Sequence, residues 1–345
     1  MKLRGKKLEN FGEPLFVAEI GQNHDGSIEK AKKMITAAGE LGCNYVKFQC
    51  WDKDSLFIKS FYKDKPGDPY LKTKSLEETL DMLSLSRENV EELVQYSREQ
   101  KIGFVSTPVA EKYVDLLVSK DVDFLKIASF DLNNHQLLSY AASQGKPIVL
   151  STGLATVQEI EDAIQVIYKA SNRELMLLHC AAVYPPKDEN VNLNNIDLLR
   201  DYFGLPVGFS DHTVGFSMAL AAIAKGACLI EKHFTLDNTI ASGDHPISAD
   251  PEQMKVIVEQ GRRIRTTLGS YRRDLSKDDL EYRAILRRSI VSRRAIRAGE
   301  VITADMIDYK RPGTGIQVCE AQYVLNRKAR RDIPANVLIN WDDLQ

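Results

Sequence analysis

The segment LPVGFSDHTVGFSMALAAIAKGACLIEKHFT, residues 205–235, contains one complete unit of the pattern that decides the fold. Two short apolar runs, LPVGFS (205–210) and CLIEKHF (228–234), flank the amphipathic stretch FSMALAAIAKGA (216–227). Nearly continuous apolar strands separated by helices are typical of a parallel sheet that is buried on both faces. A histidine stands at or just past the end of each run, and polar groups are costly inside such a sheet.

The same alternation of apolar runs and helix-period segments extends over most of the chain. Eight such units within roughly 250 residues match the size of a (β/α)8 barrel. The rival is an open doubly wound sheet, but no G-x-G-x-x-G motif follows the first run. The sequence therefore predicts a (β/α)8 TIM barrel over residues 1–268. The six other predicted strands are LFVAEIG (15–21), NYVKFQC (44–50), IGFVST (102–107), DFLKIAS (123–129), PIVLST (147–152) and LMLLHC (175–180).

The C-terminal part of the chain has a different pattern. A strongly charged stretch follows Gly269 and predicts an interdomain linker over residues 269–284. Beyond it, one apolar pattern occurs twice, which predicts a small β-rich module of two pseudo-symmetric halves over residues 285–345. The two copies are AGEVITADMI (298–307) and ANVLINWDDL (335–344), each preceded by a predicted strand, SIVSRRAI (289–296) or RKARRDI (327–333).

Composition excludes several classes of protein. The formal net charge of −2 argues against a nucleic-acid partner or a polybasic membrane surface. No stretch approaches the ~18 unbroken apolar residues that a membrane span needs. The start, MKLRGKKLENFGEP, is basic but has no apolar core, so it does not resemble a secretory signal. Five cysteines without a C-x-x-C pair indicate reduced thiols, and we expect a cytoplasmic protein.

Polar side chains gather at the carboxyl ends of the predicted strands. In a (β/α)8 barrel these ends meet at one rim, where the active site lies. Each lysine, serine or histidine taken alone is more often structural, but so many at one rim favour a ligand site. The side chains concerned include Glu19, Lys47, Gln49, Thr107, Lys126, Ser129, Asp131, Ser151, Tyr184, Ser210, His212, Glu231 and His233.

The chemistry of this set indicates an anion site beside a metal site. Lys47 and Lys126, together with the serine and threonine hydroxyls, suit a phosphate and a carboxylate. His212 and His233 end adjacent strands and can share one divalent metal with open positions, as a Lewis-acid site requires. Glu19 can serve as a base or bind the metal through water.

Three other features lie outside this set. His135, in NNHQ at a predicted helix start, is expected on the surface, and His179 is expected to be a buried structural residue. The connection 51–84 is long and polar, and a loop of that length in a compact domain is usually a lid or a docking segment.

The ordered motifs of the barrel resemble one known family. Together with a tail, SIVSRRAI…AGEVITADMIDYKRPGTGI, that looks like the antifreeze-like (SAF) module, they are similar to the sialic acid synthase family of nonulosonic acid synthases over nearly the full chain. The motifs are, in order, AEIGQNHDGS, VKFQ, VSTP, LKIAS, GKPIVLSTG, LLHCAAVYP, GFSDHT, EKHFT and SGDH.

This resemblance implies an activity and an assembly. Members are expected to be homodimers with a swapped SAF domain, in surface polysaccharide biosynthesis. They condense phosphoenolpyruvate with an N-acetylmannosamine-type open-chain sugar, release phosphate and use Mn²⁺ or Mg²⁺. Carried over, Glu19, His212 and His233 would be catalytic, with His212 and His233 as the metal ligands. Phosphoenolpyruvate would be held by Lys47, Thr107, Lys126, Ser129, Ser151 and Ser210. The sugar would face Gln49, Asp131, Tyr184, Asp244 and Arg311, with Arg311 reaching the sugar bound by the partner subunit.

Three departures from the family pattern all touch the sugar side. Asp131 stands where many relatives carry glutamate, Ala182 where some carry asparagine, and the usual G-P-D stretch is S-G-D followed by His245. The alternative is therefore a legionaminic or pseudaminic acid synthase that uses a 2,4-diacetamido-2,4,6-trideoxyhexose. Remoter alternatives are an octulosonate- or heptulosonate-type synthase, which lacks the tail, a binding protein with an inactive barrel, and a lyase with a Schiff-base lysine.

Overall fold

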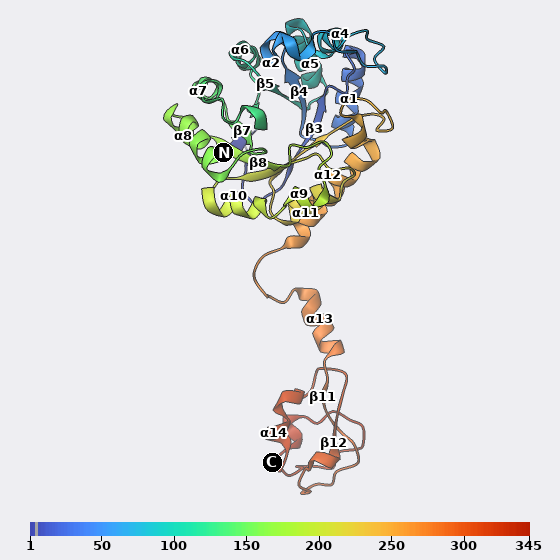
Figure 1. The fold of residues 1–345 in the computed structure, drawn as a ribbon. Coiled ribbons are helices and arrows are strands. Elements are labelled where there is room, and N and C mark those ends of the chain that lie inside the picture. The colour runs from blue at the N-terminus through green and yellow to red at the C-terminus, as the bar shows by residue number, and fades with distance from the viewer. Residues whose placement is uncertain (4–5) are drawn as a thin grey trace. The chain divides into compact units, whose positions relative to one another are not determined.

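The computed structural model describes residues 1–3 and 6–345 and divides them into two compact units. The first unit is Met1–Gly269 and the second is Ser270–Gln345. Each unit has its own apolar core, so each is described by itself. Figure 1 shows strands surrounded by helices in the first unit.

The first unit contains a parallel eight-stranded sheet with the strand order β5-β4-β3-β10-β9-β8-β7-β6. Its two end strands, β5 and β6, lie adjacent to each other, so the sheet curves into a nearly closed barrel. The predicted (β/α)8 fold is confirmed. The strands are β3 (Leu15–Gly21), β4 (Tyr45–Cys50), β5 (Gly103–Pro108), β6 (Leu125–Ile127), β7 (Ile148–Ser151), β8 (Leu175–Cys180), β9 (Val207–Asp211) and β10 (Leu229–His233).

Helices form the outer layer of the barrel (Figure 1). Several begin at side-chain caps, because Ser27, Ser86 and Thr156 each accept a hydrogen bond from the backbone N–H three residues ahead. The longer helices are α1 (Ile28–Glu40), α5 (Arg87–Glu99), α6 (Glu111–Ser119), α7 (His135–Ser143), α8 (Val157–Lys169), α10 (Asn195–Phe203), α11 (Ser217–Ala224) and α12 (Pro251–Leu268). A short helix α9 (Asp188–Val191) and two 3-10 turns, η1 (Ser129–Asp131) and η2 (His245–Ile247), lie in the loops.

The barrel interior has two layers of side chains: an apolar layer toward the amino ends of the strands and a polar layer toward their carboxyl ends. Successive side chains of a strand point to opposite faces, so a residue two positions after an apolar interior residue also points inward. Val17 precedes Glu19 in this way, and Tyr45 precedes Lys47. The apolar layer contains Leu15, Val17, Tyr45, Val105, Phe124, Val149, Met176 and Leu229. The polar layer therefore lies at the carboxyl ends of the strands, where the sequence predicts the site.

A short hairpin and a structured connection complete the first unit. The hairpin strands β1 (Lys2–Leu3) and β2 (Lys6–Lys7) are antiparallel, and Leu3 joins the apolar layer of the interior. The connection 51–84 contains three helices, α2 (Lys53–Leu56), α3 (Lys59–Tyr62) and α4 (Leu76–Leu83). It has an apolar cluster of its own, made of Trp51, Tyr62, Leu80 and Leu83.

The second unit is small and contains α13 (Lys277–Leu286), an antiparallel pair β11 (Ser289–Ser292) and β12 (Ile307–Lys310), and α14 (Ala321–Val324). The predicted repeat appears as two 3-10 turns in equivalent places, η3 (Ala304–Met306) and η5 (Trp341–Asp343). A third short 3-10 turn, η4 (Val318–Glu320), precedes α14.

Two details differ from the sequence prediction. Residues 327–333 do not form a strand, because Lys328, Ala329 and Ile333 each make a single bridge to a different segment. The fourth predicted strand, 123–129, is shortened to Leu125–Ile127 because Ser129 begins the turn η1. Among the described residues, no helix combines the length and the apolar character that crossing a membrane requires.

Gly208 marks a point of close packing in β9 and leads to a stability prediction. A Cβ atom there would lie 2.6 Å from the Leu229 carbonyl oxygen and 2.6 Å from Leu178 Cδ2. We expect Gly208→Ala to lower the free energy of unfolding by about 1–3 kcal/mol, because neighbouring strands cannot move apart independently. Urea denaturation measures the change. Gly39→Ala, in α1, is the control. A Cβ atom on Gly39 would lie 3.9 Å from the Gln100 carbonyl oxygen, so this substitution should be neutral or slightly stabilising.

Candidate active site

A cavity of about 280 Å³ opens among the carboxyl ends of the barrel strands. It brings together most of the residues that the sequence predicts for the site. These are Glu19, Lys47, Gln49, Thr107, Lys126, Ser129, Ser151, Tyr184, Ser210, His212 and His233. Glu231, for which the sequence suggested no role, also lines the cavity. The clustering of these side chains follows from the barrel, because each occupies the last inward position of its strand or the loop after it.

Four buried charges occupy the floor of this cavity. Lys47 Nζ lies 2.8 Å from Glu19 Oε2, and Glu231 Oε1 lies 3.8 Å from the ammonium nitrogens of both Lys47 and Lys126. All four side chains are almost fully buried. Charges in such surroundings persist when they are paired, so the four groups form one chain of alternating sign.

The pKa values of the two carboxyl groups, Glu19 and Glu231, are shifted in opposite directions. Burial raises the pKa of Glu19 to about 7, against the opposing attraction of Lys47. Burial also disfavours the charged form of Glu231, but Lys126 and Lys47 outweigh it and hold the pKa of Glu231 well below its usual range. Glu19 can therefore gain or lose a proton near neutral pH, whereas Glu231 stays an anion.

Hydroxyl groups surround the two lysines. Lys126 Nζ donates to Ser151 Oγ at 2.7 Å, and Lys47 Nζ donates to Thr107 Oγ1 at 3.1 Å. The backbone N–H of Gly153 donates to Ser129 Oγ at 3.1 Å, and a Cβ atom on Gly153 would lie 2.9 Å from that oxygen. Two ammonium groups and several hydroxyls within one cavity are suited to an anion with several oxygen atoms.

Ser210 connects this floor to the histidines. Its hydroxyl donates to Glu231 Oε1 at 2.9 Å. The hydroxyl oxygen, Ser210 Oγ, also lies 3.4 Å from His212 Nε2. The ring centroids of His212 and His233 are 5.5 Å apart, and Tyr184 stacks on His212 with a centroid distance of 4.1 Å. The two imidazoles and the anion pocket therefore share one cavity.

Both histidines are neutral imidazoles. Burial, and next the neighbouring His233, lower the pKa of His212 to about 4; burial, and next Lys47, lower that of His233 to about 3. His212 Nδ1 bonds to the Ala181 carbonyl at 2.8 Å, so it carries the proton and leaves Nε2 unprotonated. His233 Nδ1 is buried without a hydrogen-bond partner. Two neutral imidazoles, one with an unpartnered buried nitrogen, fit the ligand set of a divalent cation.

The protein side chains alone do not make a complete metal cage. In the described parts of the chain, no group of three or more histidine, cysteine, aspartate or glutamate side chains is arranged to hold a metal ion. The nearest carboxylate to His233 Nδ1 is that of Asp244, with Oδ2 at 3.6 Å. A cation bound by two histidines would have open positions for oxygen ligands from outside the protein.

The remaining predicted residues lie elsewhere. Asp244 stands at the edge of the cavity, beside His233. Asp131 lies in η1, where its carboxylate accepts a hydrogen bond from Asn134, and it does not line the cavity. Arg311 follows β12 in the second unit and is exposed.

His135 is exposed at the start of α7, as predicted. His179 is buried and its Nε2 lies 2.7 Å from the Val191 carbonyl, which agrees with a structural role.

The apolar part of the cavity wall was not predicted. It comes from loops rather than strand ends, and the periodicity of the strands contains no signal for it. The sequence placed Glu231 at the rim but indicated no role for it; it lies two residues before His233 and so points inward on the same strand. The apolar lining residues include Trp51, Leu56, Val109, Phe130 and Leu154.

Comparison with known proteins agrees with this arrangement. The NeuB family matches residues 34–273, and the SAF domain matches residues 287–345. The chain is 37% identical to the N,N'-diacetyllegionaminic acid synthase of Legionella pneumophila, over 100% of this chain and 97% of that protein. It is 33% identical to the pseudaminic acid synthase of Campylobacter jejuni, over 95% of this chain and 96% of that protein. The crystal structure of an N-acetylneuraminic acid synthetase from Leptospira borgpetersenii, in complex with citrate, has a TM-score of 0.73 and 30% identity, covering 83% of this chain and 96% of that one.

The buried lysines predict an anion site that can be tested without turnover. Inorganic phosphate at about ten times its dissociation constant should stabilise the folded protein by about 1.4 kcal/mol. The melting temperature of the unchanged protein should therefore rise with phosphate, and that of Lys126→Met should not. Lys146→Met removes a lysine from a surface ion pair with Asp121 and is the matched control. Equal phosphate shifts in all three proteins would contradict the assignment.

Proposed function

The chain belongs to the NeuB family and ends in a SAF domain, and from this premise we propose that it is a nonulosonic acid synthase that condenses phosphoenolpyruvate with an open-chain N-acylated amino sugar and releases phosphate. The observation that carries the proposal is the cavity in which Lys47 and Lys126 lie beside a pair of neutral histidines. One part of this cavity suits a phosphate and a carboxylate, and the other suits a carbonyl oxygen.

Phosphoenolpyruvate would occupy the side of the cavity formed by β4 to β9. Lys126 and Lys47 would offset its negative charges, and hydroxyls would hold its oxygens. This placement is supported by the existing hydrogen bonds from the two ammonium groups to Ser151 and Thr107, which are of the kind an anion would replace. The remaining proposed ligands are Ser129 and Ser210, which line the same cavity.

His212 and His233 would hold the divalent cation, Mn²⁺ or Mg²⁺. Their neutral state and the unpartnered Nδ1 of His233 support this role. When bound there, the cation would polarise the aldehyde oxygen of the sugar and make its carbon electrophilic. Tyr184 stacks on the His212 ring and would keep it oriented toward the substrate.

The residues of the chain would then manage charge and protons. The vinyl carbon of phosphoenolpyruvate forms a bond to the aldehyde carbon, which leaves positive charge on the carbon that carries the phosphate. Water adds to that carbon, and Glu19, whose pKa lies near 7, accepts its proton and passes it to the oxygen of the former aldehyde. The tetrahedral product loses phosphate and becomes a 2-keto acid. Gln49 donates to Glu19 Oε1 at 3.1 Å and would orient that carboxyl group.

The sugar has two candidate forms. The first is N-acetylmannosamine or a close analogue, facing Gln49, Asp131, Tyr184 and Asp244. The second is a 2,4-diacetamido-2,4,6-trideoxyhexose, the precursor type of legionaminic and pseudaminic acids. The apolar wall of Leu56, Val109, Phe130 and Leu154 favours the second candidate, because acetamido methyl groups and a deoxy methyl group prefer apolar surroundings.

We further propose that the protein works in the cytoplasm as a homodimer in which the SAF domain is exchanged and Arg311 reaches the sugar of the partner subunit. Support for an additional contact comes from α13, where Leu280, Tyr282 and Ile285 are exposed. Large apolar side chains gathered on one short helix are typical of a surface that another chain covers. The unpaired thiols of all five cysteines agree with a reducing compartment.

A product assay tests the proposed reaction and identifies the sugar. Phosphoenolpyruvate is supplied with N-acetylmannosamine or with a 2,4-diacetamido-2,4,6-trideoxyhexose, and released phosphate and keto acid mass are measured. We expect phosphate release that EDTA abolishes and Mn²⁺ restores, with a higher kcat/KM for the diacetamido sugar. Release of pyruvate and phosphate without a new keto acid, or turnover unaffected by EDTA, would contradict the proposal.

The histidine pair leads to a second functional prediction. His212→Ala should lower kcat by more than about a hundredfold and weaken Mn²⁺ binding by a similar factor, because one of two protein ligands is lost. Electron paramagnetic resonance of free Mn²⁺ measures binding independently of turnover. His135→Ala, on the exposed start of α7, is the control and should leave both quantities unchanged. Mn²⁺ affinity unaltered in His212→Ala would rule out His212 as a ligand.

A further inference from the structure

The tip of the connection 51–84 is fastened to two other loops of the barrel by polar contacts. Ser242, in the loop after β10, donates to Asp68 Oδ2 at 2.6 Å. The hydroxyl of Tyr70 donates to Asp25 Oδ2, in the loop after β3, at 3.2 Å. Residues separated by 174 and 45 positions in the chain therefore meet at the tip of this connection.

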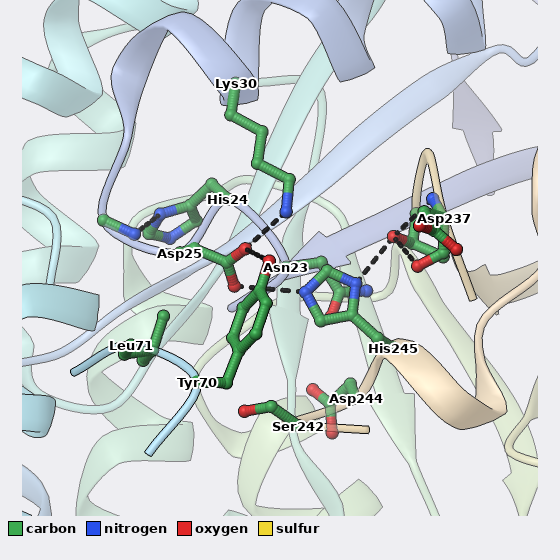
Figure 2. A network of polar contacts seen from close by, with 12 residues as sticks. Asn23, His24, Asp25, Lys30, Tyr70, Leu71, Asp237, Ser242, Asp244 and His245 are labelled. Atoms are coloured by element: carbon green, nitrogen blue, oxygen red, sulfur yellow. Dashed lines mark hydrogen bonds and ion pairs between the residues drawn. The ribbon is translucent and has the colours of Figure 1, made fainter. Parts of the chain in front are cut away.

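Asp25 is the centre of this meeting point. Figure 2 shows its carboxylate between Lys30, Tyr70 and His245. His245 Nε2 donates to Asp25 Oδ1 at 3.1 Å, and Lys30 forms an ion pair with Oδ2. On its other side, His245 Nδ1 lies 2.7 Å from Thr235 Oγ1, so both ring nitrogens of this buried histidine have partners. His245 therefore joins the start of the loop after β10, at Thr235, to Asp25 in the loop after β3.

Asp244 lies within the segment that these contacts fasten. It lies between Ser242 and His245, each of which is bonded to another loop. Its own carbonyl accepts a hydrogen bond from Ser248 Oγ at 2.7 Å, and the same hydroxyl accepts one from Asn23 Nδ2 at 2.8 Å. The backbone around Asp244 is therefore fixed to both the loop after β3 and the connection 51–84.

Asp244 in turn faces the reactive part of the cavity. Its Oδ2 lies 3.6 Å from His233 Nδ1. A Cβ atom added to Gly21 would be 3.6 Å from that carboxylate oxygen, 3.3 Å from Gln49 Nε2 and 3.1 Å from Glu19 Oε1. Asp244 and Gln49 therefore both lie close to Gly21, whose φ of +51° a side chain rarely adopts.

The other end of the connection 51–84 forms part of the cavity wall. Trp51 and Leu56 line the cavity, and Trp51 belongs to the apolar cluster at the base of the connection. The tip is organised by Asp68, whose Oδ1 accepts the backbone N–H groups of Tyr70 and Leu71 at 2.7 and 3.1 Å. One carboxylate therefore shapes the tip with one oxygen and binds Ser242 with the other.

We propose that the connection 51–84 is a lid and that Asp68, Tyr70, Asp25, Ser242 and His245 form its latch. The latch residues are positioning residues: they hold Asp244 beside His233 and Gln49 and hold the lid wall against the cavity. In this way the latch sets the affinity for the sugar and leaves the phosphoenolpyruvate side of the cavity, formed by β4 to β9, unaffected. The link to the sugar rests on the proposed function, whereas the latch itself does not.

Two mild substitutions open the latch without removing a buried side chain. Tyr70→Phe and Ser242→Ala each delete one hydroxyl, and the double variant deletes both links from the lid tip. Tyr140→Phe is the matched control, because it removes a hydrogen bond of the same type, from Tyr140 to Asp115 at 2.6 Å, on the outer helices. The ring of Tyr70 is half exposed, so its loss of a hydroxyl does not endanger folding.

Hydrogen–deuterium exchange of the substrate-free protein tests the latch. In the double variant, the amides of residues 64–74 and 240–247 should exchange about tenfold faster than in the unchanged protein. Peptides from β7 and α10 should exchange at the same rate in all variants, and the Tyr140→Phe control should match the unchanged protein at 64–74 and 240–247. Unaltered exchange at 64–74, or an equal rise throughout the barrel, would overturn the latch.

Steady-state kinetics tests the link to the sugar, with whichever of N-acetylmannosamine and the 2,4-diacetamido-2,4,6-trideoxyhexose is turned over. The double variant should raise the KM for that sugar about five- to tenfold and change the KM for phosphoenolpyruvate less than about twofold. Faster exchange with both KM values unchanged, or raised equally, would overturn the positioning role. If neither sugar is turned over by the unchanged protein, the proposed function fails, and the exchange experiment still decides the latch.

Discussion

The pairing of four charged side chains inside the barrel is the constraint on which the rest of the site depends. Glu19, Lys47, Lys126 and Glu231 come from four different strands and are all buried. An unpaired charge in such a place would cost several kcal/mol. Each strand must therefore place its charged side chain at the same level of the barrel as the oppositely charged side chain of its neighbour. The register meets this condition on β3 and β4, where Glu19 and Lys47 are direct partners.

This constraint also places the two histidines. Glu231 and His233 lie on one face of β10, so the contacts that fix Glu231 fix the height of His233 as well. On the opposite face, Lys232 Nζ lies 3.2 Å from Asp211 Oδ2, and Asp211 directly precedes His212. The ends of β9 and β10 are thus tied together by a buried ion pair next to both imidazoles. The buried charges and the histidine pair, which look separate in the sequence, are therefore held in place by the same two strands, β9 and β10.

The strands and most of the cavity residues could be predicted from the sequence because both depend on local periodicity. When an apolar run ends in an inward polar residue, that residue can be placed at the carboxyl end of a barrel strand without knowing which strands lie beside it. Tyr45 and Lys47 illustrate this. The prediction was wrong where long-range contacts decide the conformation. Residues 327–333 resemble a strand, yet each bridging residue meets a different segment, so no ladder forms. Asp131 follows a strand end in the turn η1 and is not among the residues that line the cavity, so its contact with the sugar stays a prediction.

The sequence by itself determined the barrel, the C-terminal module and the chemical character of the rim, since these follow from two-residue and helical periodicities and from residue type. Tertiary structure alone decided which groups touch. It placed Glu231 between two lysines, left a buried nitrogen of His233 without a partner, and joined Asp68 to Ser242 across 174 residues. Contacts of this kind depend on how distant loops pack together, and the spacing of residues along a chain contains no information about that packing.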